Sequence, residues 1–329
     1  MKNNPVKIGV VGVGHLGQHH VKHYKILKNV ELVGLFDTDK NRAQEISKKY
    51  DTTAFDELSS LIMKTDALSI VVSTRNHAEI AEICIKNKKH VFIEKPITAT
   101  LEEADRLLSM ANENEVLIQV GHIERLNPAL LALKPYDIKP KFIEIQRLAP
   151  YTSRGTDVPV VLDKMIHDID ILLSLVNAPV KTIKATGLSI LTDSIDIAHA
   201  RVRFSNGTVA SIMSSRVAKD EVRKIKVFQK DLYATLDLLI GSTEVYEIVE
   251  NSKDSSNSKM AIPFKYGNEK KLIVYNKPNL ESGDPLQMEL ENFAFSILGQ
   301  QNPIVSGKEG RDALEFAMEI QKMIIQDTH

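Results

Sequence analysis

The sequence has almost no cysteine and no excess charge of either sign. Cys84 is the single cysteine among 329 residues, so no disulfide can form within the chain, and the cysteine spacing of a structural zinc site is missing. Lys and Arg number 42 and Asp and Glu number 43, which gives a formal net charge of -1. This balance provides no overall field that would attract nucleic acid or an anionic membrane. We therefore expect neither as a partner.

Long hydrophobic runs are missing as well. No stretch approaches the roughly 18 apolar residues of a transmembrane helix, and residues 1–5 lead into a strand pattern without the apolar region of a signal peptide. Apolar residues make up 43% of the chain and charged residues 26%, which excludes wholesale disorder and a fibrous repeat. At roughly 150 residues per domain, we expect a cytoplasmic protein of two domains.

The first part of the chain alternates short apolar runs with helical patterns. These runs do not alternate between apolar and polar residues, which indicates strands buried on both faces, and helices between such strands are typical of a parallel sheet. We therefore predict an α/β domain over residues 1–122. Its strands are expected at residues 7–13, 31–36, 67–73, 90–95 and 115–121.

The pattern changes after residue 122, where alternating strands follow one another. Asn206-Gly207 between two such strands is a strong hairpin signal. We predict a mixed domain over residues 123–329, with a large, mostly antiparallel open sheet packed on helices. Because its strands carry apolar residues on both faces, we expect the uncovered face to pair with another subunit in a homodimer or homotetramer. The helices are predicted at residues 160–176, 289–298 and 310–325.

A glycine-rich turn follows the first predicted strand and opens the first helix. Its residues, Gly12-Val13-Gly14-His15-Leu16-Gly17, form a GxGxxG motif in the context that dinucleotide binding requires. The first glycine permits the tight turn, the second lets a pyrophosphate approach the backbone, and the third allows close packing of helix and strand. The alternative is a purely structural turn.

Asp37 ends the second predicted strand, twenty residues after Gly17. A carboxylate at this point accepts hydrogen bonds from the adenosine ribose and repels the 2′-phosphate of NADP. Neither Thr38 nor Asp39 is an arginine that could bind such a phosphate, so the sequence favours NAD. Alternatively, Asp37 or Asp39 simply caps the following helix.

Glu94-Lys95-Pro96 ends the strand predicted at residues 90–95. Ligands of open α/β sheets lie at the carboxyl ends of the strands, so a lysine at this position is expected to reach the ligand. The alternative is a surface lysine before a turn.

The helix predicted at residues 160–176 carries a narrow polar stripe. On an α-helix, Asp163, His167, Asp170 and Ser174 fall within a stripe roughly 60° wide, whereas Lys164 and Asp168 point elsewhere and are expected to reach solvent. Asp163 and His167 are spaced i,i+4, so the carboxylate can orient an imidazole that acts as a general base.

Two alternatives remain for this stripe. It can be an ordinary solvated Asp–His pair, or Asp163, His167 and Asp170 can bind a cation. No cysteine or second histidine lies at ligand spacing, so we expect no metal. Three other histidines, His77, His122 and His199, are expected to be structural or to line the wall of a cleft.

Together these motifs resemble the Gfo/Idh/MocA oxidoreductases, and the resemblance extends over nearly the whole chain. It implies an NAD(P)-dependent enzyme acting on a sugar, cyclitol or nucleotide sugar, with Lys95, Asp163 and His167 as the catalytic set. The motifs are residues 12–17, Ser73-Thr74-Arg75-Asn76-His77, residues 94–96 and Asp163-Lys164-Met165-Ile166-His167. The residues expected to contact NAD are Gly12, Gly14, His15, Leu16, Gly17, Asp37, Ser73, Thr74, His77, Glu94 and Lys95.

A finer resemblance is to the UDP-N-acetylglucosamine 3-dehydrogenase branch, which supplies diamino sugars for lipid A. It rests on residues 121–129, 147–150 and 154–157. Arg125, Arg147, Arg154 and Arg216 suit a pyrophosphate, unless they form salt bridges with carboxylates. The residues expected to contact substrate are Lys95, Arg125, Asn127, Arg154, Asp163 and His167.

This resemblance implies a reaction in the crevice between the two domains. His167 takes the proton of the C3 hydroxyl, Asp163 fixes the imidazole, and Lys95 stabilises the alkoxide. The keto sugar would pass to a separate aminotransferase. One alternative is a dehydrogenase of a free sugar or inositol, and another is an NAD-binding sensor without turnover.

Overall fold

The computed structural model describes residues 4–152, 158–250, 261–266, 269–280 and 283–327. The chain forms two compact units. The first contains residues 1–125 and 283–315, and the second contains residues 126–282 and 316–329. No helix within the described ranges combines the length and the apolar character needed to cross a bilayer.

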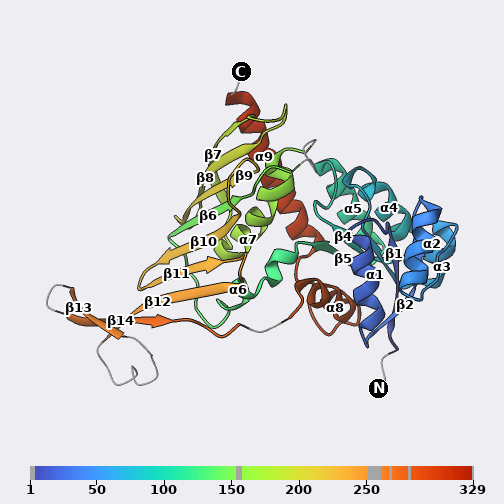
Figure 1. Cartoon of the computed structure of the whole chain (residues 1–329), viewed down its shortest axis with the longest axis horizontal. Coiled ribbons are helices and arrows are strands. Elements are labelled where there is room, and N and C mark those ends of the chain that lie inside the picture. Colours follow the sequence, from blue (N-terminus) through green and yellow to red (C-terminus); the bar gives the residue numbers. More distant parts are fainter. Residues whose placement is uncertain (1–3, 153–157, 251–260, 267–268, 281–282, 328–329) are drawn as a thin grey trace. The chain divides into compact units, whose positions relative to one another are not determined.

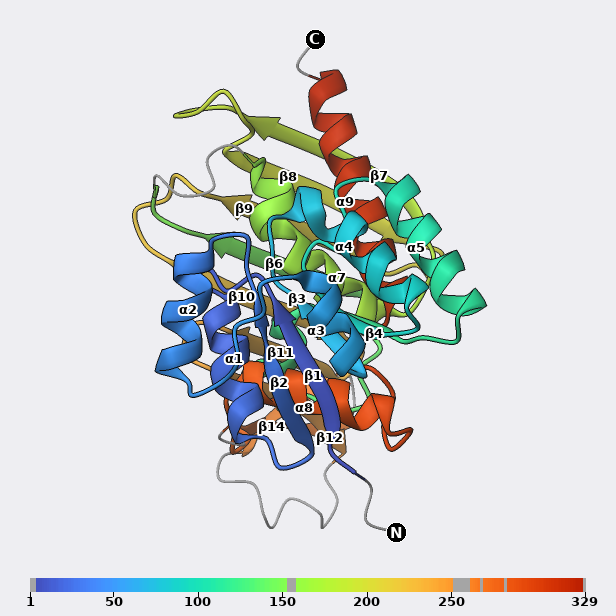
Figure 2. The same ribbon diagram turned by 90° about the vertical axis from the view of Figure 1, so that its right-hand side faces the viewer.

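The first unit is built on a parallel sheet of five strands in the order β2-β1-β3-β4-β5. Figure 2 shows β1 and β2 side by side with helices flanking the sheet. The strands are β1 (Val6–Val11), β2 (Val30–Phe36), β3 (Ala67–Ile70), β4 (His90–Glu94) and β5 (Ile118–Gly121). The helices are α1 (Gly17–Ile26), α2 (Lys40–Lys49), α3 (Leu58–Lys64), η1 (Thr74–Asn76), α4 (His77–Lys86), α5 (Leu101–Glu113) and α8 (Pro285–Ile297).

Local sequence explains where these helices begin. Asp39 caps α2 by accepting a hydrogen bond from the amide of Arg42, and Thr100 and Glu103 form a capping box at the start of α5. Pro285 occupies the first turn of α8 behind the cap Asp284. Strands β1 and β3 are runs of mostly buried apolar residues, as predicted, whereas β2 at the edge of the sheet is only partly buried.

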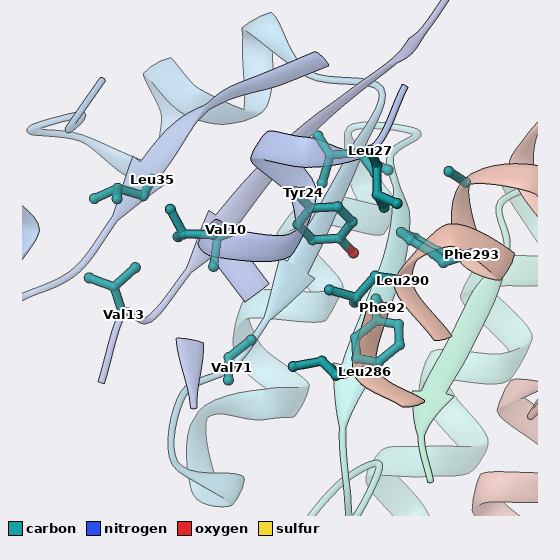
Figure 3. Packing of buried hydrophobic residues seen from close by; sticks show 14 of the residues in the cluster. Val10, Val13, Tyr24, Leu27, Leu35, Val71, Phe92, Leu286, Leu290 and Phe293 are labelled. Atoms are coloured by element: carbon teal, nitrogen blue, oxygen red, sulfur yellow. The ribbon is translucent and has the colours of Figure 1, made fainter. Parts of the chain in front are cut away.

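Helix α8 returns from the far end of the sequence to complete the core of the first unit. Figure 3 shows Leu286, Leu290 and Phe293 of α8 packed with Tyr24 of α1 and Phe92 of β4. The rings of Phe92 and Phe293 meet edge to face, with centroids 5.8 Å apart. The predicted division at residue 122 placed this helix in the second domain. The amphipathic pattern of a helix predicts that one face is buried, but not against which sheet.

The second unit is built on a sheet of nine strands in the order β13-β14-β12-β11-β10-β6-β9-β8-β7 (Figure 1). All pairs are antiparallel except β6 with β9, so the sheet is mixed and mostly antiparallel, as predicted. The strands are β6 (Phe142–Leu148), β7 (Val180–Leu188), β8 (Ile197–Phe204), β9 (Val209–Ser215), β10 (Val222–Gln229), β11 (Leu232–Asp237), β12 (Ser242–Glu250), β13 (Ala261–Tyr266) and β14 (Glu269–Asn276).

One face of this sheet is covered by helix, and alternation along the strands supplies the buried side chains. Ile143 and Ile145 of β6 and Ile225 of β10 are fully or almost fully buried on this face. The predicted hairpin at Asn206-Gly207 joins β8 to β9, where Gly207 has a φ of 87°. The helices of this unit are α6 (Pro128–Leu131), η3 (Val161–Met165) and α7 (Ile166–Val176), while η2 (Ile123–Leu126) and α9 (Gly307–Asp327) have residues in both units.

The opposite face carries a row of aromatic side chains that crosses five strands. Phe142 and Phe228 lie directly opposite one another, as do Phe228 and Tyr233 and then Tyr233 and Tyr246, and Tyr275 follows on β14. Neighbouring ring centroids are 4.8 to 5.8 Å apart. We call these five residues the aromatic row.

Candidate active site

The glycine-rich loop has the geometry that each glycine was expected to provide. Gly12 has a φ of 85°, and a Cβ atom there would lie 2.6 Å from the carbonyl oxygen of Val71. A Cβ on Gly17 would lie 2.0 Å from the carbonyl oxygen of Gly12, so the first turn of α1 packs against the loop itself. By contrast, a Cβ on Gly14 would meet nothing within 4 Å. Open space above a backbone at the start of a helix fits the approach of a pyrophosphate.

Asp37 follows β2 and faces this loop. Its carboxylate accepts hydrogen bonds from the amide of Val13 at 2.8 Å and from the amide of Asp39 at 2.9 Å. The cap of α2 is Asp39 and not Asp37. Both carboxylate oxygens of Asp37 are therefore held in place by backbone amides beside the glycine-rich loop.

A cavity of about 330 Å³ lies where these elements meet, within the first unit. Gly12, Gly14 and Asp37 line it, together with residues that follow β3. The open space at Gly14, the tight loop and the fixed carboxylate together fit the pyrophosphate and adenosine ribose of a dinucleotide. The full lining is Val11, Gly12, Gly14, Phe36, Asp37, Thr38, Arg42, Val71, Val72, Ser73, Arg75, Asn76 and Ile80.

The loop residues between the glycines are more exposed. His15 is exposed and packs edge to face on His19, with ring centroids 5.6 Å apart, and Leu16 is 41% exposed at the start of α1. Of the predicted cofactor contacts after β3, Ser73 lines the cavity and Thr74 begins η1.

Glu94 ends β4 and Lys95 follows it, and a buried polar network holds Glu94. Its carboxylate lies 3.2 Å from Nε2 of His20 and accepts a hydrogen bond from the amide of Lys95. The other ring nitrogen of His20 contacts the hydroxyl of Ser69, which is fully buried on β3. A Cβ on Gly121 would lie 2.9 Å from Glu94, so glycine leaves room for this carboxylate. The network fixes the backbone at the strand end that carries Lys95.

His77, a predicted cofactor contact, is buried and does not line the cavity. Its ring nitrogens lie 2.9 Å from the carbonyl oxygen of Pro96 and 3.1 Å from that of Val72. Burial lowers the pKa of His77, although these carbonyls act in the opposite direction. The ring therefore connects the segment after β4 with the segment after β3. This is a structural role, which the sequence left open as the alternative to cofactor binding.

The polar segment of the second unit is a π-helix followed by an α-helix. The π-helical turn η3 contains Asp163 and Lys164, and α7 contains His167. The predicted single α-helix was wrong at this turn, and π-helical turns are frequent at functional sites. Asp163 and His167 are both half-buried, and the carboxylate of Asp163 lies 3.7 Å from Nζ of Lys164.

Two aspartates of this segment lie elsewhere than the helical spacing predicted. Asp168 was expected to reach solvent but is 1% exposed, and it accepts hydrogen bonds from the guanidinium of Arg147 at 2.9 Å to each carboxylate oxygen. Asp170 is equally buried, whereas Ser174 is exposed. Asp168 is buried because β6 supplies Arg147 as its partner. The sequence of α7 alone does not show that a strand places an arginine against this side of the helix.

Three of the four arginines considered for pyrophosphate binding form ion pairs. Arg147 pairs with Asp168, and Arg216 is buried beside Asp196. Arg125 pairs with Glu309 at 3.2 Å. The fourth, Arg154, lies outside the described residues.

Asn127 has a structural function in the second unit. Its side chain caps α6 through the amide of Ala129 and donates a hydrogen bond to the carbonyl of Leu238.

Two histidines singled out in the sequence, His122 and His199, are not among the residues that line the cavity. His122 is fully buried, and His199 is exposed on β8, where it contacts the hydroxyl of Ser211 at 2.9 Å. Within the described parts of the chain, no group of three or more His, Cys, Asp or Glu side chains is arranged to hold a metal ion.

Three residues near the predicted motifs were missed by sequence reasoning. His20 contacts Glu94, and Arg42 and Arg75 line the cavity with Asp37. His20 lies three residues after the last glycine of the motif, on the helix that this motif opens, so its position was a usable signal. Arg75 stands inside the motif Ser73–His77 but was given no role of its own, and Arg42 lies in a helical pattern without any motif.

The two parts of the chain match two families. Residues 6–122 match the family described as "Oxidoreductase family, NAD-binding Rossmann fold". Residues 144–231 match the family described as "GFO/IDH/MocA C-terminal domain".

Individual proteins resemble the chain along almost its whole length. The UDP-N-acetylglucosamine 3-dehydrogenase of Acidithiobacillus ferrooxidans is 33% identical over 317 residues, which are 96% of each chain. A solved structure of that enzyme superposes with a TM-score of 0.87 and covers 98% of both chains. The myo-inositol 2-dehydrogenase of Thermotoga maritima is 26% identical and covers 97% of this chain and 96% of its own.

These matches agree with the glycine-rich cavity and the two sheets. A family of dehydrogenases also argues against a sensor without turnover. The chain belongs to the Gfo/Idh/MocA family and is an NAD-dependent oxidoreductase that acts on a CH–OH group.

Proposed function

We propose that this protein oxidises the C3 hydroxyl of a nucleotide sugar such as UDP-N-acetylglucosamine to the 3-keto sugar. The observation that carries the proposal is the likeness to the UDP-N-acetylglucosamine 3-dehydrogenase of A. ferrooxidans, which extends over 96% of both chains. At 33% identity this likeness supports a shared reaction more strongly than a shared substrate. The nucleotide sugar is therefore the part of the proposal that an experiment must test.

The cofactor is held by residues of the first unit. Gly14 would let the pyrophosphate approach the backbone, Gly12 and Gly17 would provide the tight turn and the close packing that form the loop, and Asp37 would accept hydrogen bonds from the adenosine ribose. When bound, NAD supplies a hydride acceptor, and the protein contributes binding, orientation and electrostatics.

We assign the acid–base chemistry to three side chains. His167 removes the proton from the substrate hydroxyl as a general base. Asp163 orients the imidazole and stabilises its protonated form, and its half-buried position on the π-helical turn supports this role. Lys95 stabilises the negative charge that develops on the same oxygen. The buried contact between His20 and Glu94 helps to hold the backbone of Lys95 in place, because Glu94 accepts a hydrogen bond from the amide of Lys95.

We assign part of the diphosphate contact to Arg154, because Arg147 and Arg216 are buried in ion pairs. Arg125 and Asn127 remain proposed substrate contacts. Each would have to keep its structural partner, Glu309 or the α6 backbone, or exchange it for the sugar. An Arg154→Gln variant that raises KM for the nucleotide sugar but not for NAD would support this assignment.

A second candidate is the oxidation of inositol, favoured by the likeness to the myo-inositol 2-dehydrogenase of T. maritima over 97% of this chain. Inositol has no diphosphate, so this candidate assigns no role to Arg154. Arg154→Gln should therefore raise KM for a nucleotide sugar but leave KM for inositol unchanged.

The direct test is a panel of substrates with the full chain and NAD, followed by the absorbance of NADH. The panel contains UDP-N-acetylglucosamine, UDP-glucose, UDP-glucuronate, free N-acetylglucosamine and myo-inositol. The proposal expects the highest kcat/KM with UDP-N-acetylglucosamine and a product whose NMR spectrum shows a carbonyl at C3. Turnover of inositol alone would establish the second candidate. An inactive panel with a chain that binds NAD would overturn both.

Two further proposals concern partners. A 3-keto sugar is the substrate that a sugar aminotransferase requires, so we expect such an enzyme to consume the product and to pull an unfavourable oxidation forward. We also propose that the chain forms a homodimer or homotetramer through the aromatic row.

A further inference from the structure

The cavity that receives NAD contains two guanidinium groups that a neutral ribose does not require. Arg42 and Arg75 line it together with Asp37. The sequence favours NAD because no arginine directly follows Asp37, but α2 brings Arg42 back to the same cavity five residues later. A cation that could bind a 2′-phosphate is therefore already in place.

Arg42 is held only lightly. Its guanidinium lies 3.3 Å from the carboxylate of Asp39, which also caps the helix by accepting a hydrogen bond from the amide of Arg42. Both side chains are close to half exposed, at 48% and 46%. An exposed pair of this kind contributes roughly 0–1 kcal/mol. The guanidinium can therefore leave Asp39 for a stronger anion at small cost.

Arg75 lines the cavity from a different element, the 3-10 turn η1 after β3. Its side chain is exposed, and among the residues that the structure describes it has no carboxylate partner. Guanidinium groups bind phosphate oxygens in a planar, two-pronged geometry.

The group that opposes a phosphate here is Asp37. Its carboxylate cannot turn away, because the amides of Val13 and Asp39 hold both oxygens. A second anion placed at the ribose 2′ position would be repelled by this fixed charge. Thus the cavity contains one fixed carboxylate and two available cations.

We propose that the preference for NAD rests on the charge of Asp37 alone, and that Arg42, assisted by Arg75, forms a latent binding site for the 2′-phosphate of NADP. Removal of that single charge then suffices to let the protein bind NADP. The inference concerns the cofactor and goes beyond the proposed sugar chemistry. It stands or fails independently of the substrate.

The experiment measures binding to the full chain by calorimetry. AMP and 2′,5′-ADP serve as the first pair of ligands, since they differ only by the 2′-phosphate, and NAD and NADP serve as the second pair. The variants are Asp37→Ser, Asp37→Asn and each of these combined with Arg42→Gln or with Arg75→Gln. Asp37→Asn keeps an acceptor for the backbone amides while losing the charge, so it decides the question if Asp37→Ser does not fold.

A matched arginine provides the control. Arg106 on α5 is half exposed, is paired with Glu82 and lies outside the cavity lining. Arg106→Gln in the Asp37→Asn background should leave the affinity for 2′,5′-ADP unchanged. Circular dichroism and the melting temperature confirm that each variant is folded.

We expect the affinity for 2′,5′-ADP and for NADP to rise by about 10- to 100-fold in the Asp37 variants, the range of a hydrogen bond to a charged group. Addition of Arg42→Gln should remove most of this gain, and Arg75→Gln should remove a smaller part. The gain should also shrink as salt increases. Folded Asp37 variants without any gain for 2′,5′-ADP would overturn the proposal. So would a gain that is unaffected by Arg42→Gln.

Discussion

Nε2 of His20 lies 3.2 Å from Oε1 of Glu94, directly behind the strand end that carries Lys95. His20 is fully buried, and the side chain of Glu94 is 11% exposed. Polar groups are expensive to bury unless they are hydrogen-bonded. Here they are, since Ser69 satisfies the second ring nitrogen of His20 and the amide of Lys95 satisfies the second oxygen of Glu94.

Removal of one partner of this buried contact should destabilise the first unit. We expect Glu94→Ala to lower the free energy of unfolding by about 1–3 kcal/mol, because His20 and the amide of Lys95 lose their common acceptor. Urea unfolding followed by circular dichroism measures this change. The control is Glu82→Ala, which removes two surface ion pairs, with Arg106 and with Lys86, and should cost about 1 kcal/mol or less. Equal effects of the two substitutions would contradict the buried network as a source of stability.

The stability of the protein should fall at acidic pH, in part because of His77. Burial holds the pKa of His77 below its ordinary value, so the unfolded chain, with a histidine pKa of about 6.5, binds this proton more readily than the folded chain. The contribution to stability is complete above about pH 6.5 and is lost progressively as the pH falls toward the folded-state pKa. The slope is at most about 1.4 kcal/mol per pH unit for one proton.

His77→Gln tests this prediction through the pH dependence of urea unfolding. Between about pH 7.5 and pH 5.5, the variant should lose less stability than the unaltered protein. Part of the pH dependence should remain, because burial also lowers the pKa values of His90 and His23. His199→Gln, at an exposed position on β8, provides the control. An unchanged slope in a folded His77→Gln variant would refute the assignment.

The aromatic row predicts assembly. Five rings on adjacent strands form an apolar stripe on the face of the sheet opposite α7, and apolar patches of this kind mark interfaces. Light scattering should show a dimer or tetramer. Tyr233→Glu at the centre of the row should weaken the association about tenfold or more. Met63→Glu, at a 75% exposed position of the first unit, should have no effect. A monomer at micromolar concentration would rule out this interface.

Much of the first unit could be predicted because its signals are local. The apolar runs of β1 to β5 and the glycine-rich turn are readable from neighbouring residues alone. The short helix α3 and the strands β12 and β13 were not predicted. Helix α3 has only seven residues, and β13 contains Pro263, which argues against a strand unless it lies at the edge of a sheet, as β13 does.

Contacts between distant residues were harder to predict. The period of an α-helix predicted on which side of the helix Asp168 lies. Its pair with Arg147, however, depends on how β6 packs against α7. The π-helical turn at Val161–Met165 also shifts the positions that a regular α-helix would give. Arg42 and Arg75 reach the cavity from two separate elements, and no motif joins them in the sequence.

Lys95 and Asp163 should affect turnover in different ways. Lys95→Ala removes the charge that stabilises the alkoxide and should lower kcat by about 10²–10³-fold. Asp163→Asn should leave the fold intact but orient the imidazole less well. Combined with His167→Ala, it should therefore cost little more than His167→Ala alone. Fully additive losses in kcat for Asp163→Asn and His167→Ala would show that the two residues do not act as a unit.

The most direct test of the proposed chemistry is kcat of His167→Ala, measured with the substrate identified by the panel, together with the affinity for NAD. As the general base, His167 should contribute about 10²–10⁴-fold to kcat, so the variant should lose that factor while its affinity for NAD changes little. The loss should be greatest at neutral pH and should diminish at high pH, where hydroxide can replace the base. A His167→Ala variant with near-normal kcat on that substrate would contradict the account.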